Sequence, residues 1–528
     1  MGVTVFHRGT LAWGMDGSAG QDCDRLVVQG DRIVDPATPV PDDATRVDLA
    51  GGWLGPAFGD GHAHLLLAGR EHSGPQIRSA TSLDDLLERV RVWAQRHPDA
   101  AWIVGAGYDS TLAPQGHFDA RWLDSVVPDR PVILRAWDYH TIWCNTPALR
   151  LAGLDEDTPD PVDGIIVRRP DGSPLGTLIE SGATDPVLSR VPRTSVEDAV
   201  GELAWATAQA ASHGITWVQD AWVEPTDLPV WSAAARRGVL SVDVDLALRA
   251  DPARWQAQRG ELPRLRDQVE GLPGLTCRTL KFFLDGIIEN HTAYLLQDYV
   301  DDCGAGLPVW GSQQLSQAFL DADRLDFDLH LHAIGDGAVR MALDAAQRLR
   351  TQRGRHRRIT LAHAQLVAEP DLRRFAELEV TVCFQPLWAA EDAVMRELTL
   401  PRLGPQRALQ YRMRSVLEAG ATISFGSDWP VTSANVLAGI RTAVTRQTPD
   451  GHPAQGWQPG ERIEITQALA AATTGVAWQA RAQGVRGVLR PGAQADLVWL
   501  SADPRMARPR DLPGIEVLGT WRRGQRTY

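Results

Sequence analysis

The stretch between residues 197 and 425 alternates amphipathic segments with short apolar runs, and this alternation limits the folds that the chain can adopt. Helical spacing is present over residues 197–213, 315–325, 337–350, 368–378 and 408–419. Each of these segments is followed by an apolar run of strand length, at residues 215–218, 327–332, 359–363, 380–384 and 422–425. Repeated helix–strand units predict a parallel sheet. So many units in one run, with polar residues at the strand ends, favour a closed (β/α)8 TIM barrel within the α/β class.

Both ends of the chain have a different pattern of apolar and polar residues from this middle part. Residues 1–55 and residues 485–528 alternate short apolar runs with turn residues, which is a strand–turn–strand pattern. Neither end is long enough for a good core alone, so we predict that the two pair into one small β-sandwich domain. The barrel would then occupy residues 56–484. Residues 75–190 are too long for one connection and predict an α/β insertion after the first barrel strand, placed to cover the barrel mouth.

Composition excludes several classes of protein. The 528 residues include 53 Lys+Arg and 66 Asp+Glu, and the net charge of −13 without a long basic run argues against nucleic acid as the main partner. The chain contains no run of about 18 apolar residues, so no membrane span is predicted. Residues 1–13 lack the apolar core of a signal peptide. The odd, scattered cysteines (Cys23, Cys144, Cys277, Cys303 and Cys383) predict neither disulfides nor a thiolate zinc site. A cytoplasmic protein is expected.

The chain contains a single lysine, Lys281, among its 53 basic residues. It lies in an apolar, strand-like segment over residues 278–286, where a buried ammonium is costly and its pKa would be lowered. A neutral primary amine can add carbon dioxide to form a carbamate that bridges two metals, whereas an arginine cannot. The alternative is a lysine paired with Asp285 or Glu289.

Five further residues have positions that suit metal ligands. In the segment Asp60-Gly61-His62-Ala63-His64, the two histidines point to the same side of a strand. Three other candidates each stand at the end of a predicted strand: His332, His363 and Asp428. Any one of these residues alone is explained more simply as an ordinary polar residue at a strand end. Their joint order along the barrel strands, with Lys281 between them, is much harder to produce by accident.

This pattern resembles the metal-dependent amidohydrolase superfamily, and more narrowly amidohydrolase family 3, which contains N-substituted formamide deformylases. The resemblance runs almost from end to end. Besides the segments already named, it includes residues 53–60, 102–105, 144–149, 214–216, 427–431 and 491–497.

The resemblance implies a ligand set and a mechanism. His62, His64 and Asp428 would hold the more buried metal, His332 and His363 the second, and Lys281 as its carbamate would bridge both. His and carboxylate ligands suit zinc, with iron, manganese or cobalt as alternatives. The pair of metals would share a hydroxide that attacks a carbonyl carbon. Asp428 would act as general base and acid.

Supporting roles are expected for three histidines and one carboxylate. His363 or His330 would stabilise the oxyanion. Because His330 shares a face with His332, a place behind the ligands is favoured for it over a contact with the substrate. His291 is a candidate for the pocket wall. Asp60 is expected to orient His62 or His64.

The substrate is expected to be a small molecule with an apolar or aromatic part. Nineteen tryptophans are many, and five lie in predicted loops or strand ends: Trp137, Trp143, Trp222, Trp388 and Trp429. They favour an N-substituted formamide or an N-acyl amine. The alternatives are a deaminase, a cyclic-amide or carbamate hydrolase on the same barrel, or a non-catalytic regulatory protein. A homodimer is left open.

Overall fold

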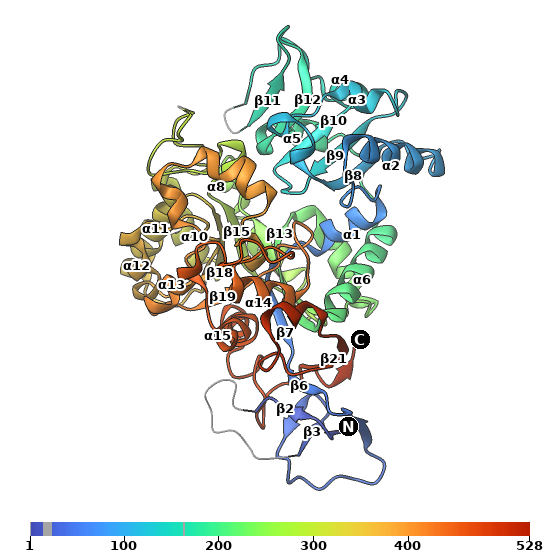
Figure 1. Cartoon of the computed structure of the whole chain (residues 1–528), viewed down its shortest axis with the longest axis vertical. Helices are drawn as coiled ribbons and strands as arrows, with labels where there is room; N and C mark the ends of the chain where they lie inside the picture. The colour runs from blue at the N-terminus through green and yellow to red at the C-terminus, as the bar shows by residue number, and fades with distance from the viewer. Residues whose placement is uncertain (1, 14–23, 162–163, 302) are drawn as a thin grey trace.

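The structure, a computed structural model, describes residues 2–13, 24–161, 164–301 and 303–528. Three parts follow one another along its longest axis (Figure 1): both chain ends at the bottom, a barrel in the middle, and an inserted subdomain at the top. Cys23 lies outside the described residues, and Cys144, Cys277 and Cys383 are buried free thiols. No helix in the described ranges is long and apolar enough to cross a membrane.

The barrel sheet consists of eight parallel strands in the order β19-β18-β17-β16-β15-β14-β13-β7. Their bounds are β7 (Phe58–Ala63), β13 (Ile215–Val223), β14 (Asp243–Arg249), β15 (Leu275–Phe283), β16 (Asp328–Ala333), β17 (Ile359–His363), β18 (Val380–Phe384) and β19 (Ile423–Phe425). The two outer strands approach each other, because the Asp428 N–H after β19 donates to the carbonyl of His62 on β7 at 2.7 Å. The predicted (β/α)8 barrel is confirmed.

Helices cover the outside of this sheet. The main ones are α1 (Leu65–Ser73), α6 (Val196–Ser212), α7 (Leu228–Arg236), α10 (Ser312–Arg324), α11 (Asp336–Arg353), α12 (Leu372–Glu377), α13 (Met413–Glu418), α14 (Val436–Thr445) and α15 (Ile465–Ala470). The segment predicted as helical over residues 408–419 becomes α-helical only at Met413. The reason is that Gln410 bridges to Leu366 and Tyr411 adopts φ 48°, which interrupts a helix.

The two chain ends pair as predicted. One sheet has the order β2-β6-β20-β21-β22, with β2 (Thr10–Leu11), β6 (Trp53–Pro56), β20 (Leu497–Leu500), β21 (Val517–Arg522) and β22 (Gln525–Arg526). Within it β6 pairs antiparallel with β20. A second sheet has the order β4-β3-β1-β5, with β1 (Val3–His7), β3 (Arg25–Gln29), β4 (Arg32–Val34) and β5 (Thr45–Asp48). Phe6 and Trp521 join the two sheets edge to face, with ring centroids 4.9 Å apart.

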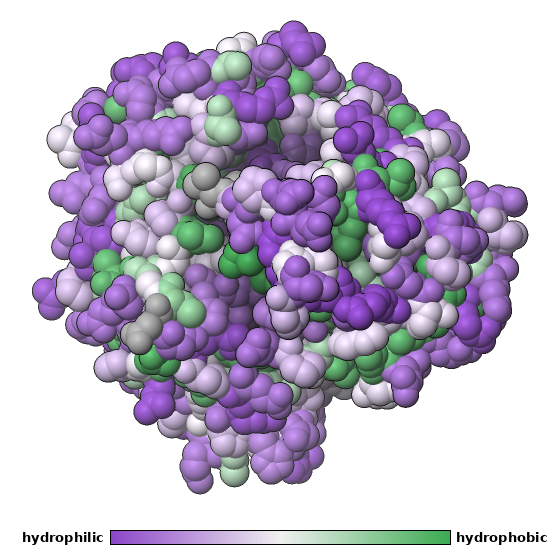
Figure 2. Space-filling view, turned by 90° about the horizontal axis from the view of Figure 1, so that it is seen from above, coloured by the Kyte–Doolittle hydropathy of each residue, from purple (hydrophilic) through white to green (hydrophobic). Residues whose placement is uncertain are grey.

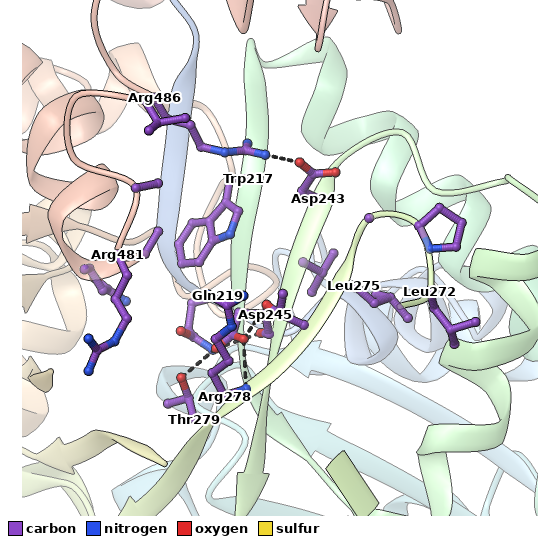
Figure 3. Close-up of a pocket in the computed structure, with 18 of the residues that line it drawn as sticks. Trp217, Gln219, Asp243, Asp245, Leu272, Leu275, Arg278, Thr279, Arg481 and Arg486 are labelled. Atoms are coloured by element: carbon purple, nitrogen blue, oxygen red, sulfur yellow. Dashed lines mark hydrogen bonds and ion pairs between the residues drawn. The ribbon is translucent and has the colours of Figure 1, made fainter. Parts of the chain in front are cut away.

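Ion pairs attach the C-terminal segment to the amino ends of the barrel strands. Asp243, at the start of β14, pairs with Arg486 and, at 2.9 Å, with Arg523. Arg486 also pairs with Asp496 at 2.9 Å. Asp243, Arg486 and Arg523 line a cavity of about 730 Å³, which Arg486 crosses to reach Asp243 (Figure 3). Because the buried carboxylates have arginine partners, we interpret this cavity as part of the structural junction between the chain ends and the barrel.

The inserted subdomain lies between the first and second barrel strands. Its sheet has the order β11-β12-β10-β9-β8, with β8 (Ile103–Tyr108), β9 (Val132–Ala136), β10 (Thr141–Cys144), β11 (Ile165–Arg168) and β12 (Pro174–Ile179). Its helices are α2 (Leu83–Arg96), α3 (Ala120–Asp124), α4 (Thr146–Ala152) and α5 (Glu180–Leu188). The subdomain has apolar clusters of its own on both faces of this sheet. The predicted insertion after the first barrel strand is confirmed.

Candidate metal centre

All six residues predicted as metal ligands line one cavity of about 390 Å³. Four of them lie on strands: His62 on β7, Lys281 on β15, His332 on β16 and His363 on β17. The other two follow strands, His64 after β7 and Asp428 after β19. Parallel strands of a barrel all end at one mouth, so residues far apart in the sequence meet there. Each of the six is buried.

His62, His64 and Asp428 form the tightest group, and their candidate ligand atoms lie within 4.8 Å of one another. The Asp428 Oδ1 atom is 3.0 Å from His64 Nε2 and 3.4 Å from His62 Nε2. Burial alone would raise the pKa of Asp428, but the hydrogen bond from His64 and nearby positive charge lower it to about 2. The carboxylate is therefore ionised and available to a cation. Asp428 also holds a left-handed backbone with φ 57°, a strain that tends to collect at functional sites.

His332 and His363 face this group from the neighbouring strands. Their ring centroids are 4.6 Å apart, and those of His363 and His62 are 4.8 Å apart. The His363 Nδ1 atom bonds Gln385 Oε1 at 2.8 Å, which leaves its Nε2 free. Burial lowers the pKa of His62, His332 and His363 well below the usual value, so their rings are neutral and their lone pairs can bind a metal.

Lys281 is fully buried, and its Nζ atom has no hydrogen-bond partner within the described part of the chain. The alternative pairings do not occur. Asp285 accepts backbone N–H groups, including those of Ile334 (3.0 Å) and Gly335 (2.8 Å), and Glu289 accepts from Thr399. Burial lowers the pKa of Lys281 to about 7. An unpaired amine of this kind is largely neutral near physiological pH.

The donor set fits a divalent metal. Two of the candidate ligands have a buried nitrogen without a hydrogen-bond partner among the described residues: Lys281 Nζ and His64 Nδ1. Leaving buried polar atoms unsatisfied is costly, and metal ligation would offset that cost. Neutral imidazoles with a carboxylate are the ligands that zinc and its neighbours in the first transition row prefer.

Residues around the ligands have clear contacts. His330 and His62 form a 2.8 Å hydrogen bond between Nε2 and Nδ1, so His330 lies behind His62. Asp60, expected to orient His62 or His64, accepts the backbone N–H groups of His62 (3.1 Å) and Ser427 (2.9 Å). This carboxylate therefore joins the two ligand-bearing loops. His291 pairs with Asp301 at 2.6 Å and does not line the cavity.

Aromatic side chains wall the cavity. Trp222 packs edge to face on Phe283, with centroids 5.1 Å apart, and Trp388 stacks on His363 at 5.3 Å. The other three tryptophans considered lie elsewhere: Trp137 packs on Trp388, Trp429 on Trp205, and Trp143 in the core of the insertion. Seen from above, this face of the molecule is mostly hydrophilic and is hollowed near its middle, where apolar side chains gather (Figure 2).

The sequence analysis missed the part of the cavity wall that comes from the insertion. This part includes Arg135, Asp138, Tyr139, His140 and Glu180. A signal was present, because residues 138–140 are polar or amphipathic and follow an apolar run, as the ligands do on the barrel strands.

Comparison with known proteins agrees with this geometry. A model described as "Amidohydrolase family" matches residues 45–528. "Protein LONG AFTER FAR-RED 3" of Arabidopsis thaliana is 30% identical over 505 residues, covering 93% of this chain and 84% of that protein. "N-substituted formamide deformylase" of Arthrobacter pascens is 24% identical over 514 residues, covering 92% of this chain and 90% of that protein. The crystal structure of a metal-dependent hydrolase from Pyrococcus furiosus matches with a TM-score of 0.71 and 25% identity, covering 95% of this chain and 100% of that chain.

The matched region contains the whole barrel and every residue of the candidate centre. The family resemblance predicted from the motifs is thus confirmed over most of the chain. With its buried histidines and carboxylate gathered at the barrel mouth, the chain belongs to the amidohydrolase family, whose members are metal-dependent hydrolases acting on carbon–nitrogen bonds.

Proposed function

We propose that the cavity binds two divalent metals, with zinc as the first choice. His62, His64 and Asp428 would hold one metal, and His332 and His363 the other. Lys281 as a carbamate would connect them. The observation that carries this proposal is the buried Lys281 amine. It has no hydrogen-bond partner within the described ranges, although it lies in one cavity with the other five candidate ligands, which are four histidines and Asp428.

The proposed reaction is hydrolysis of an amide. When bound, the metals would lower the pKa of a water molecule and polarise the carbonyl oxygen of the substrate. Asp428 would take the proton of the attacking water and return it to the nitrogen as the carbon–nitrogen bond breaks. Gln385 would hold the ring of His363, and His330 that of His62, so that each presents its other nitrogen to the cavity.

The preferred substrate is an N-substituted formamide or an N-acyl amine with an aromatic group. Trp222, Phe283 and Trp388 supply an apolar wall beside the candidate ligands, which suits such a group. The name of the Arthrobacter relative points to the same chemistry. A deaminase is less well supported, because it typically needs one metal and no bridging lysine. A binding protein without activity is less well supported because all six ligand positions are retained.

A hydrolysis screen tests the proposal. Protein loaded with zinc and bicarbonate would be assayed on N-benzylformamide, N-benzylacetamide, methyl N-benzylcarbamate and a benzyl-substituted lactam. These compounds share the aromatic part and differ in the bond that is cleaved. We expect the highest kcat/KM for the formamide or the acetamide, and loss of activity in Asp428→Asn. Faster cleavage of the carbamate or the lactam would overturn the substrate assignment, and a metal content near zero would favour a binding protein.

A further inference from the structure

The inserted subdomain brings a histidine–carboxylate pair to the cavity. His140 follows β9, and its Nδ1 atom is 2.8 Å from Glu180 Oε2 at the start of α5. Both residues line the cavity that contains the candidate ligands. Glu180 has φ 61°, a left-handed conformation that is strained for this residue type, and its backbone N–H donates to the His140 carbonyl at 2.9 Å. The pair is thus fixed through both its side chains and its backbone.

Contacts from the barrel hold this pair in place. Thr292, in the loop after the lysine-bearing strand β15, donates its hydroxyl to Glu180 Oε1 at 2.6 Å. Asn290 of the same loop donates to Thr141 Oγ1 at 3.0 Å. A Cβ atom added at Gly286 would lie only 2.1 Å from Glu180 Oε1, so the carboxylate lies directly against the barrel backbone. The insertion is therefore attached firmly to the barrel at the point where it presents His140.

The orientation of the His140 ring leaves one nitrogen for a ligand. Its centroid is 5.2 Å from that of His332, and the ring is half-buried at the cavity wall. Glu180 takes Nδ1, whereas Nε2 makes no hydrogen bond to the described residues. The backbone N–H of His140 donates to Asp138 Oδ1 at 2.7 Å, which fixes the base of the side chain. The Nδ1–H group donates to the Glu180 carboxylate, and this ion pair favours the doubly protonated ring, in which Nε2 also carries a proton that it can donate.

We propose that His140 is a catalytic residue supplied by the insertion, and that it donates its Nε2–H to the carbonyl oxygen of the substrate as that oxygen becomes negative. Glu180 is its positioning residue. This inference rests on the proposed amide hydrolysis. The oxygen of water joins the carbonyl carbon, the carbon–nitrogen bond breaks, and the proton that Asp428 received passes to the departing nitrogen. No bond forms to His140, and it keeps its proton throughout. A fixed donor aimed at developing charge contributes strongly in a site that excludes water.

Kinetics of matched variants test the proposal. His140→Ala removes the donor, Glu180→Gln weakens its orientation, and His97→Ala is the control, because His97 is an exposed histidine of the same subdomain. In His140→Ala we expect kcat on N-benzylformamide to fall about 100-fold or more, with KM and metal content nearly unchanged. Glu180→Gln should lose less kcat and should also shift the pH profile. A purely structural role would instead lower the metal content or affect KM and stability.

A binding measurement separates this inference from the proposed function. The probe is the monomethyl ester of benzylphosphonate, a tetrahedral anion, titrated by calorimetry into the metal-loaded proteins. We expect at least about a 10-fold weaker affinity in His140→Ala and no change in His97→Ala. Unchanged affinity and unchanged kcat in His140→Ala, or loss of its metals, would overturn the proposal. If the wild type hydrolyses no amide but its phosphonate affinity still depends on His140, the proposed function fails and the oxyanion site stands.

Discussion

Replacing Lys281 by methionine should stabilise the metal-free protein at low pH and much less at high pH. Burial lowers the pKa of this amine from 10.5 to about 7. Because the folded-state pKa is depressed, the contribution of Lys281 to stability is fully present above 10.5 and is lost as the pH falls through 7. As the pH falls from about 9 to about 6, the free energy of unfolding of the wild type should decrease by about 3 kcal/mol relative to that of the variant, at about 1.4 kcal/mol per pKa unit.

The assay is urea unfolding of both proteins at several pH values, with a chelator present and carbon dioxide removed. Methionine has a similar shape and no charge, so it keeps the packing and removes the titration. Arg278→Met is the matched control, because Arg278 is an exposed cation on the same strand, and its difference from wild type should not vary with pH. If the difference between wild type and Lys281→Met stays constant within about 0.5 kcal/mol over this range, the folded amine keeps its proton as the unfolded one does, and the reasoning is refuted.

Three further predictions concern the metal centre and the attachment of the chain ends. Lys281→Arg keeps the charge but cannot form a carbamate. Metal analysis should find fewer than two metals per chain, and the hydrolysis assay should show no activity; a fully active variant would exclude the carbamate. His330→Ala frees the Nδ1 atom of His62 and should weaken metal affinity about 10-fold to 100-fold in a chelator competition, whereas unchanged affinity would show that the hydrogen bond does not support the ligand. Asp243→Asn removes one of the two carboxylates that pair with the half-buried Arg486 and should cost about 1–3 kcal/mol in thermal unfolding. A loss no larger than that of the exposed control Asp267→Asn would contradict this.

The fold was predictable because its signals are local. Each helix–strand unit has its own periodicity, and the ligands stand at strand ends, which a parallel barrel brings to one mouth. His62 and His64 could be assigned to one face from the period-2 rule alone. The single lysine was conspicuous because arginine replaces lysine everywhere else in the chain.

Contacts between distant segments could not be predicted in this way. The partner of His330 is His62, 268 positions away, and Asp60 binds Ser427 as well as the backbone of His62. The start of α13 was misplaced because the pairing of Gln410 with Leu366 interrupts a locally helical pattern. Each of these features depends on a contact between segments that are far apart in the sequence.

The sequence by itself determined the barrel, the pairing of the chain ends, the existence of an insertion and the order of the candidate ligands, because these follow from short-range patterns of apolar and polar residues. Only the tertiary structure decided what fills the rest of the cavity wall. It left the Lys281 amine without a partner and brought His140 and Glu180 beside His332. The physical reason is that such contacts depend on how the insertion packs against the barrel loops, and no local periodicity specifies that packing.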